Sequence, residues 1–148
     1  MKKLLILLIT ISALFSCSDT EDAPQAKLFD SDHYPQKWIL VEMSGQIPNS
    51  VTTGSDMPWQ EYYILKSDGT FLKHRDDSGN SLEGTGTFHF TTDENGELLE
   101  LNYSESNAIV GTCSSVKQAE ELRLDASDKL IGTWSACDGP GLKYERFE

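Results

Sequence analysis

The sequence predicts an all-β protein, a small antiparallel up-and-down β-barrel of about eight or nine strands. Short β-type runs alternate with turn signals from residue 37 onward, and no segment has the periodicity of a long amphipathic helix. So many short strands in one domain must close into a barrel or pack as two sheets. Glycines at positions 84, 86 and 132 suit the tight bends of a small barrel.

The strands can be placed in order along the chain. We expect them at residues 37–43, 60–66, 70–75, 83–90, 97–103, 108–113, 120–125, 129–135 and 142–147. Ser67-Asp68-Gly69 is typical of a three-residue hairpin loop, which would place Leu65 opposite Phe71. Alternation then predicts one inward face, formed by Tyr63, Leu65, Phe71, Lys73 and Arg75 and continued by Gly86, Phe88, Phe90, Leu99, Leu101 and Tyr103.

The N-terminus has the pattern of a secretory signal. Lys2 and Lys3 precede an apolar run over residues 4–14, which is shorter than the roughly 20 residues of a membrane-spanning helix. Leu14-Phe15-Ser16-Cys17 resembles the lipobox of bacterial lipoproteins. That resemblance implies that residues 1–16 are a signal peptide and that Cys17 carries a diacylglyceryl group with acyl chains such as palmitate. The protein would then be lipid-anchored in the cell envelope, at the outer membrane.

The segment after the cysteine is polar and acidic, so residues 17–27 are expected to be a flexible tether and residues 28–148 the barrel domain. Its acidic start also resembles the signal that sends some lipoproteins to the cell surface, and the periplasmic face stays open as the alternative. Removing residues 1–16 leaves a formal charge of −14, because Lys2 and Lys3 are lost from 12 basic residues while all 24 acidic residues remain. Such a surface excludes nucleic acid as a natural partner.

Cys113 and Cys137 form an even pair once Cys17 is acylated, and in an oxidising compartment they predict a disulfide. His33, His74 and His89 lack the spacing of a compact metal site. Residues 76–80 match a calcium loop in composition only. Without a Gly-x-Ser-x-Gly elbow or any other catalytic pattern, we expect no metal, no cofactor and no enzymatic activity.

Three motifs carry a resemblance to a known family. They are Gln36-Lys37-Trp38-Ile39-Leu40-Val41-Glu42, the hairpin over residues 63–71, and Gly84-Thr85-Gly86-Thr87-Phe88. Together they make residues 36–147 similar to the lipocalin-like lipoproteins, which are small antiparallel barrels. The resemblance implies that Trp38 packs at the closed barrel end against an arginine near the last strand, a position that Arg146 matches.

Two functions remain open for such a barrel. The first is binding of a small apolar or amphipathic ligand, with Tyr63, Lys73, Arg75 and Tyr103 at the mouth. The two cations would favour a carboxylate or phosphate head group, unless they pair with local acids. The alternative is a structural, interaction or inhibitor-like protein with a filled barrel, which binds a protein partner through the loop over residues 44–59. An enclosed cavity above ~300 Å³, lined by aromatic residues, would favour binding of a small ligand. A filled interior with an apolar loop patch would favour binding of a protein partner.

Overall fold

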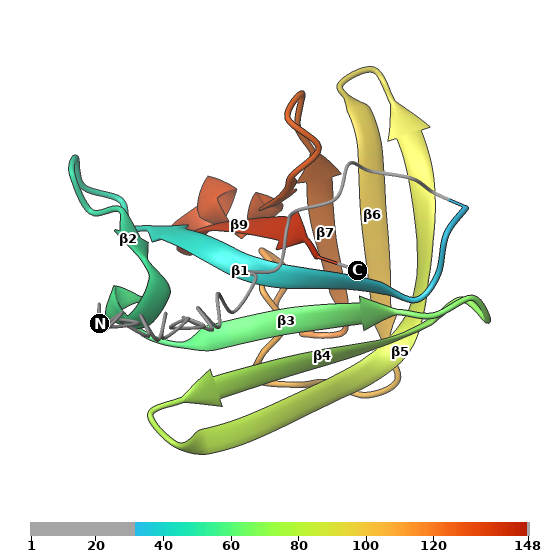
Figure 1. The fold of residues 1–148 in the computed structure, drawn as a ribbon, viewed down its shortest axis with the longest axis horizontal. Helices are drawn as coiled ribbons and strands as arrows, with labels where there is room; N and C mark the ends of the chain where they lie inside the picture. Colours follow the sequence, from blue (N-terminus) through green and yellow to red (C-terminus); the bar gives the residue numbers. More distant parts are fainter. Residues whose placement is uncertain (1–31, 148) are drawn as a thin grey trace, which may run out of the picture.

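The computed structural model describes residues 32–147 and shows one antiparallel sheet closed into a barrel (Figure 1). Eight strands form the barrel, and each pairs with the next until β9 closes on β1. A short strand, β2, adds to the end of β1, where Met43 pairs with Thr52. The strands are β1 (Gln36–Ser44), β2 (Thr52–Thr53), β3 (Gln60–Leu65), β4 (Thr70–Asp77), β5 (Asn80–Asp93), β6 (Gly96–Tyr103), β7 (Ala119–Leu124), β8 (Leu130–Gly132) and β9 (Gly141–Arg146). The predicted up-and-down barrel is confirmed.

Because neighbouring strands run in opposite directions, the connections of the barrel alternate between its two ends. One end, the turn end, has tight connections at residues 66–69, 94–95 and 125–129. The other, the loop end, carries residues 45–59, 78–79, 104–118 and 133–140 and includes two short 3-10 helices, η1 (Gly54–Asp56) and η2 (Thr133–Cys137). In Figure 1 the 45–59 loop and the β4–β5 turn both lie on the left.

The β3–β4 hairpin forms with the register that its turn residues predict. Leu65 pairs with Phe71, and the Lys66 backbone N–H donates to the Thr70 carbonyl at 2.9 Å. Gly69 has a φ of 79°, which a glycine adopts without strain. The Asp68 carboxylate accepts hydrogen bonds from the backbone and side chain of Thr70, and these bonds lower the pKa of Asp68.

The inward face predicted from alternation is the buried face. Tyr63, Leu65, Phe71, Lys73 and Arg75 are all buried. On β5 and β6 the inward side chains are Phe88, Phe90, Leu99, Leu101 and Tyr103, of which Phe90 is partly buried and the others buried. Large side chains from β1, β7, β8 and β9 complete the core, namely Trp38, Leu40, Leu122, Leu130, Leu142 and Tyr144.

The strand predicted over residues 108–113 is wrong, because this segment belongs to the irregular 104–118 loop. It has the apolar composition of a strand because it enters the barrel mouth, where the side chains of Ile109 and Val110 are buried. Its backbone groups bind interior side chains in place of a neighbouring strand: the Ile109 carbonyl accepts from Lys73, and the Gly111 N–H donates to Glu120. The predicted strand over 129–135 is also shorter than expected, since η2 begins at Thr133.

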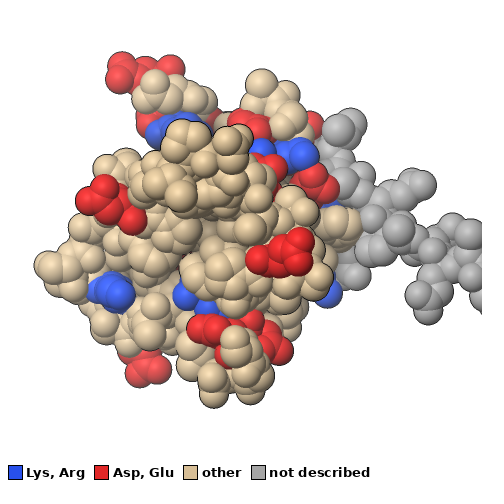
Figure 2. Space-filling model, turned by 90° about the vertical axis from the view of Figure 1, so that its left-hand side faces the viewer, with Lys and Arg blue, Asp and Glu red and all other residues tan. Residues whose placement is uncertain are grey.

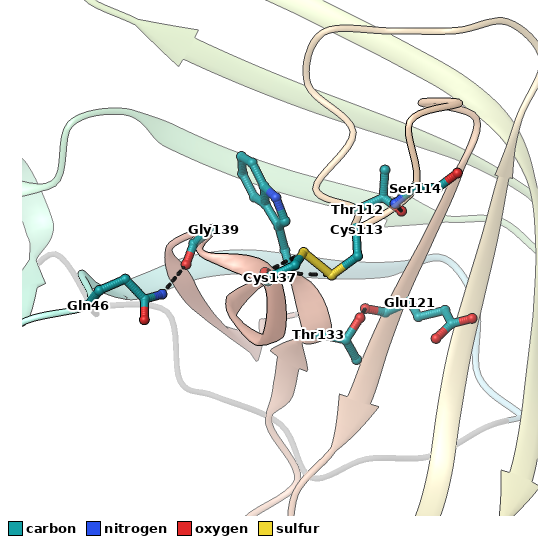
Figure 3. Close-up of a disulfide and its surroundings, with 9 residues drawn as sticks. Gln46, Thr112, Cys113, Ser114, Glu121, Thr133, Cys137 and Gly139 are labelled. Carbon is teal, nitrogen blue, oxygen red and sulfur yellow. Dashed lines mark hydrogen bonds between the residues drawn. A yellow bond between two sulfur atoms is a disulfide. The ribbon is translucent and has the colours of Figure 1, made fainter.

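A disulfide joins Cys113 of the 104–118 loop to Cys137 of η2, with their Cα atoms 5.7 Å apart (Figure 3). This confirms the predicted pairing. The Gln46 side-chain amide donates to the Gly139 carbonyl at 2.7 Å, which ties the 45–59 loop to the segment that follows η2 (Figure 3). Three loops of the loop end are therefore connected to one another.

Removing this disulfide with Cys113→Ser and Cys137→Ser is expected to lower the free energy of unfolding by about 3 kcal/mol. The bond closes a sequence separation of 24 residues, and its loss returns that chain entropy to the unfolded state. Urea unfolding of the oxidised protein and of the double variant measures the difference. An unchanged unfolding free energy would show that the bond adds nothing to stability.

The predicted signal peptide, Cys17 and tether lie outside residues 32–147. Within that range, none of the helices has the length and apolar composition needed to cross a membrane.

Candidate functional site

Near the loop end, the barrel interior holds a buried lysine between two carboxylates. Lys73 on β4 places its Nζ 3.1 Å from Glu61 Oε1 and 3.0 Å from both carboxylate oxygens of Glu120. Its third partner is the carbonyl of Ile109, at 2.8 Å. The Lys73 ammonium therefore directs its three N–H donors to protein acceptors. All three charged residues are almost fully buried, with Lys73 at 0% exposure.

A second cation adjoins this group. The Arg75 Nε donates to Glu61 Oε2 at 2.5 Å, and its terminal nitrogen donates to the Ile109 carbonyl at 3.2 Å. The Arg75 guanidinium lies over the Trp59 ring at 4.3 Å, a cation–π geometry. Thus one backbone carbonyl of the 104–118 loop is held by both interior cations.

Three tyrosines surround the charges. The Tyr103 hydroxyl donates to Glu120 Oε2 at 2.5 Å, and the Tyr144 hydroxyl donates to Glu61 Oε1. The Lys73 ammonium lies 4.9 Å from the centroid of the Tyr63 ring, which packs edge-on against Tyr144. Burial, followed by the nearby carboxylates, raises the pKa of all three hydroxyls well above the ordinary value of 10.0, so they stay neutral.

The cluster of Glu61, Lys73, Arg75 and Glu120, here called the buried ion cluster, contains two positive and two negative groups and is balanced in charge. Breaking such a pairing is costly, because one partner is then left charged and desolvated. Lys73 lies between the two carboxylates. These contacts can hold the 104–118 loop in the barrel mouth. The side chains of the cluster direct their hydrogen bonds toward the barrel interior.

Tyr63, Lys73, Arg75 and Tyr103, the predicted ligand-binding residues, do come together in the structure. They are buried, at 0%, 0%, 8% and 6% exposure, and contact protein groups. Sequence reasoning missed the acids that pair with them. Alternation could have identified both, because Glu61 lies two residues before Tyr63, and Glu120 two residues before the buried Leu122.

Trp38 and Arg146, predicted to pack together, are buried and pair directly across β1 and β9. The Trp38 indole N–H donates to the Gln36 side chain, and Arg146 donates to the His33 carbonyl. These contacts lie at the turn end, where β1 starts and β9 ends. The structural role of the pair stays a prediction.

His74 and His89 lie on the outward face of the barrel. The His74 ring stacks on the Tyr62 ring, with their centroids 4.9 Å apart, and His74 Nδ1 lies 3.4 Å from Glu83 Oε1. His89 Nε2 lies 3.2 Å from Glu100 Oε2. Over residues 32–147, no three His, Cys, Asp or Glu side chains are grouped in a way that could hold a metal ion.

The loop end carries two clefts that adjoin at Pro58 and Trp59. One, of about 580 Å³, is lined by Gly54, Ser55, Met57, Pro58, Trp59, Gln60, Asp76 and Ser78. The other, of about 380 Å³, is lined by Met43, Ser44, Gly45, Ser50, Thr52, Asp56, Pro58, Trp59 and Pro140. Pro58 and Trp59 thus form a ridge between the clefts, and Arg75 of the buried ion cluster contacts this ridge through the Trp59 ring.

At alkaline pH the three buried tyrosines are expected to destabilise the fold. Their pKa values are raised in the folded state, so the unfolded chain loses these protons first as the pH rises. The stability that they contribute is therefore complete below pH 10 and is lost progressively above it. Tyrosinate absorbance and circular dichroism, followed together, should show these tyrosines ionising as the barrel unfolds. Ionisation of all five tyrosines near pH 10 with the fold intact would contradict this.

Comparison with known protein families, with curated proteins and with solved structures found no match to this chain. The closed eight-stranded meander is consistent with a calycin-like fold.

Proposed function

We propose that this chain is a lipocalin-like lipoprotein of the cell envelope that binds a protein partner through the loop end of its barrel, without catalysing a reaction. Cys17 would anchor it to the outer membrane, on the surface or the periplasmic face. The observation that carries the proposal is the buried ion cluster, which occupies the barrel mouth where a ligand would otherwise enter. Binding is then directed to the surface formed by the loops.

The 45–59 loop supports this choice. It forms the ridge of Pro58 and Trp59 between the two clefts, and it presents Ile47 and Val51 to solvent at 72% and 56% exposure. A barrel mouth occupied by the buried ion cluster, together with exposed apolar side chains on the loop, favours a protein partner over an enclosed small ligand.

A second candidate is supported by the volume of the clefts. At about 380 and 580 Å³ they lie within the range of small-molecule sites, roughly 300–1,000 Å³. A small apolar or amphipathic ligand would then bind at the ridge and not in the barrel interior. Native mass spectrometry of the full chain purified from its host distinguishes the two, because a reproducible bound small molecule would support this candidate.

The leading proposal can be tested by placing a photo-crosslinking amino acid at either end of the barrel in host cells. At Ile47 on the loop end, we expect a discrete crosslinked protein. At Glu94 on the turn end, which is also exposed, we expect none. Equal crosslinking from both positions, or none from Ile47, would contradict binding through the loop end.

The anchor has its own test. The wild-type chain is expected to incorporate radiolabelled palmitate and to fractionate with the outer membrane, while Cys17→Ser should do neither. Membrane attachment of the Cys17→Ser chain at the wild-type level would overturn the lipoprotein assignment.

A further inference from the structure

The charge of the buried ion cluster bears on what the loop end can bind. Lys73 and Arg75 could attract an anionic group only if they were unpaired. Instead, Lys73 contacts both Glu61 and Glu120, and Arg75 contacts Glu61. With each cation matched by a carboxylate at about 3 Å or less, the cluster offers no net positive charge to the clefts outside it.

The charge of the clefts themselves is negative. Asp76 lines the larger cleft and Asp56 the smaller one, and among the described residues that line either cleft none is Lys, Arg or His. Both acids are exposed. The rest of the lining is uncharged, with Trp59 and Pro58 common to both clefts. Each cleft therefore combines an apolar wall with a single carboxylate.

Exposed apolar side chains gather at the same end. Of the large apolar residues that are exposed within residues 32–147, all four belong to it: Ile47, Val51, Leu82 at the start of β5, and Val116 of the 104–118 loop. Figure 2 shows the face that carries the 45–59 loop, on which most of the surface is neither acidic nor basic and the acidic groups are more extensive than the basic ones. Exposed apolar side chains at a single end of the barrel favour an interaction site there.

From these observations, and resting on the proposed function, we infer that the loop end binds a basic, apolar polypeptide segment of its partner. Such a segment would cross the ridge of Pro58 and Trp59, with an apolar side chain in the cleft lined by Met43 and Pro140 and a Lys or Arg side chain beside Asp76. A polypeptide fits better than a small cation, because the exposed apolar residues extend beyond both clefts.

Charge complementarity also decides against two other occupants. The chain has a formal charge of −12, so a second copy would be repelled, and so would the anionic lipids of a membrane surface. The same net charge would attract a basic segment over a distance of about one Debye length, roughly 8 Å at physiological salt.

The inference can be tested by titrating the full acylated chain, solubilised in a non-ionic detergent, with two synthetic peptides. One alternates lysine with valine, and the other alternates glutamate with valine. Isothermal titration calorimetry at low and at high salt should show binding of the lysine peptide only, and this binding should weaken as salt is added. Equal binding of both peptides would overturn the inference.

Two variants locate the binding. Asp56→Asn with Asp76→Asn should weaken binding of the lysine peptide by about five- to tenfold, as expected for two exposed ion pairs. The asparagine at position 76 keeps the oxygen that accepts from the Gly79 N–H, so the β4–β5 turn is retained. Glu94→Gln removes one exposed carboxylate at the turn end and should have no effect. If Glu94→Gln weakened binding as much as Asp56→Asn with Asp76→Asn, the peptide would be attracted to the whole molecule, and the site would be overturned.

The peptide titration and the crosslinking experiment together distinguish failure of this inference from failure of the proposed function. If neither peptide binds while the crosslink from Ile47 persists, the loop end binds a partner of other chemistry and only this inference fails. If the crosslink is also absent, the proposed function fails with it. Binding of the purified chain to phosphatidylglycerol vesicles, lost in Ile47→Ser with Val51→Ser, would assign the apolar face to a membrane and overturn the inference.

Discussion

Replacing Lys73 with methionine is expected to lower the free energy of unfolding by about 3–5 kcal/mol. Methionine has nearly the length of lysine, so the main change is the loss of the ammonium group. Glu61 and Glu120 would then face each other without the cation that lies about 3 Å from both. Their repulsion and desolvation would favour the unfolded chain, and the Ile109 carbonyl would lose its shortest hydrogen bond.

Urea unfolding, followed by circular dichroism, measures this loss. Lys66→Met makes the same substitution at an exposed position beside the β3–β4 turn and should change stability by less than about 1 kcal/mol. Glu61 keeps its ion pair with Arg75, so adding Glu120→Gln to Lys73→Met removes the carboxylate charge left without a cation and should recover about 1 kcal/mol or more. If Lys73→Met is as mild as Lys66→Met, the buried ion cluster is not a major contribution to the stability of the barrel.

The strand pattern could be predicted because it depends on local rules. The Ser67-Asp68-Gly69 turn sets the register of β3 and β4, and alternation then places Lys73 and Arg75 on the same face as Leu65 and Phe71. Both rules involve residues that are close in sequence. They predicted correctly that two cations point into the barrel.

The partners of these cations depend on contacts that no local rule describes. Glu120 is 47 residues from Lys73 in sequence, and the Ile109 carbonyl is 36 residues away. The segment around Ile109 has an apolar run that is typical of a strand, but the Ile109 carbonyl accepts from Lys73 and Arg75, and the Gly111 N–H donates to Glu120. Tertiary hydrogen bonding decided its conformation, and strand propensity did not.

The clefts at the loop end were beyond sequence reasoning for a similar reason. The sequence predicts the 44–59 loop as the contact surface of the alternative function, but it does not predict which segments lie beside that loop. Pro140 closes one cleft from the segment before β9, and Asp76 and Ser78 border the other from the β4–β5 turn. These segments meet only because the barrel brings alternate connections to the same end.

Replacing Gly86 with alanine is expected to destabilise the barrel by at least about 4 kcal/mol, a loss typical of forced backbone movement. A Cβ at this position would lie 1.9 Å from the backbone oxygen of Asn102 and 2.8 Å from the Cα of Tyr103, so β5 and β6 would have to separate. Gly86 lies between Phe71 and Tyr103 in one row of paired residues. Because Gly86 has no side chain, the Phe71 and Tyr103 rings pack edge to face, with their centroids 4.9 Å apart.

Gly132→Ala is the matched control, because its Cβ would meet the nearest atom, in Leu142, at an ordinary 3.4 Å. We expect that variant to stay within about 1 kcal/mol of the wild type in urea unfolding. The comparison separates the general cost of alanine for glycine in a strand from the specific need for close approach at Gly86. Equal stability of the two variants would mean that β5 and β6 can move apart at little cost. The position of Tyr103, whose hydroxyl binds Glu120, would then not depend on this glycine.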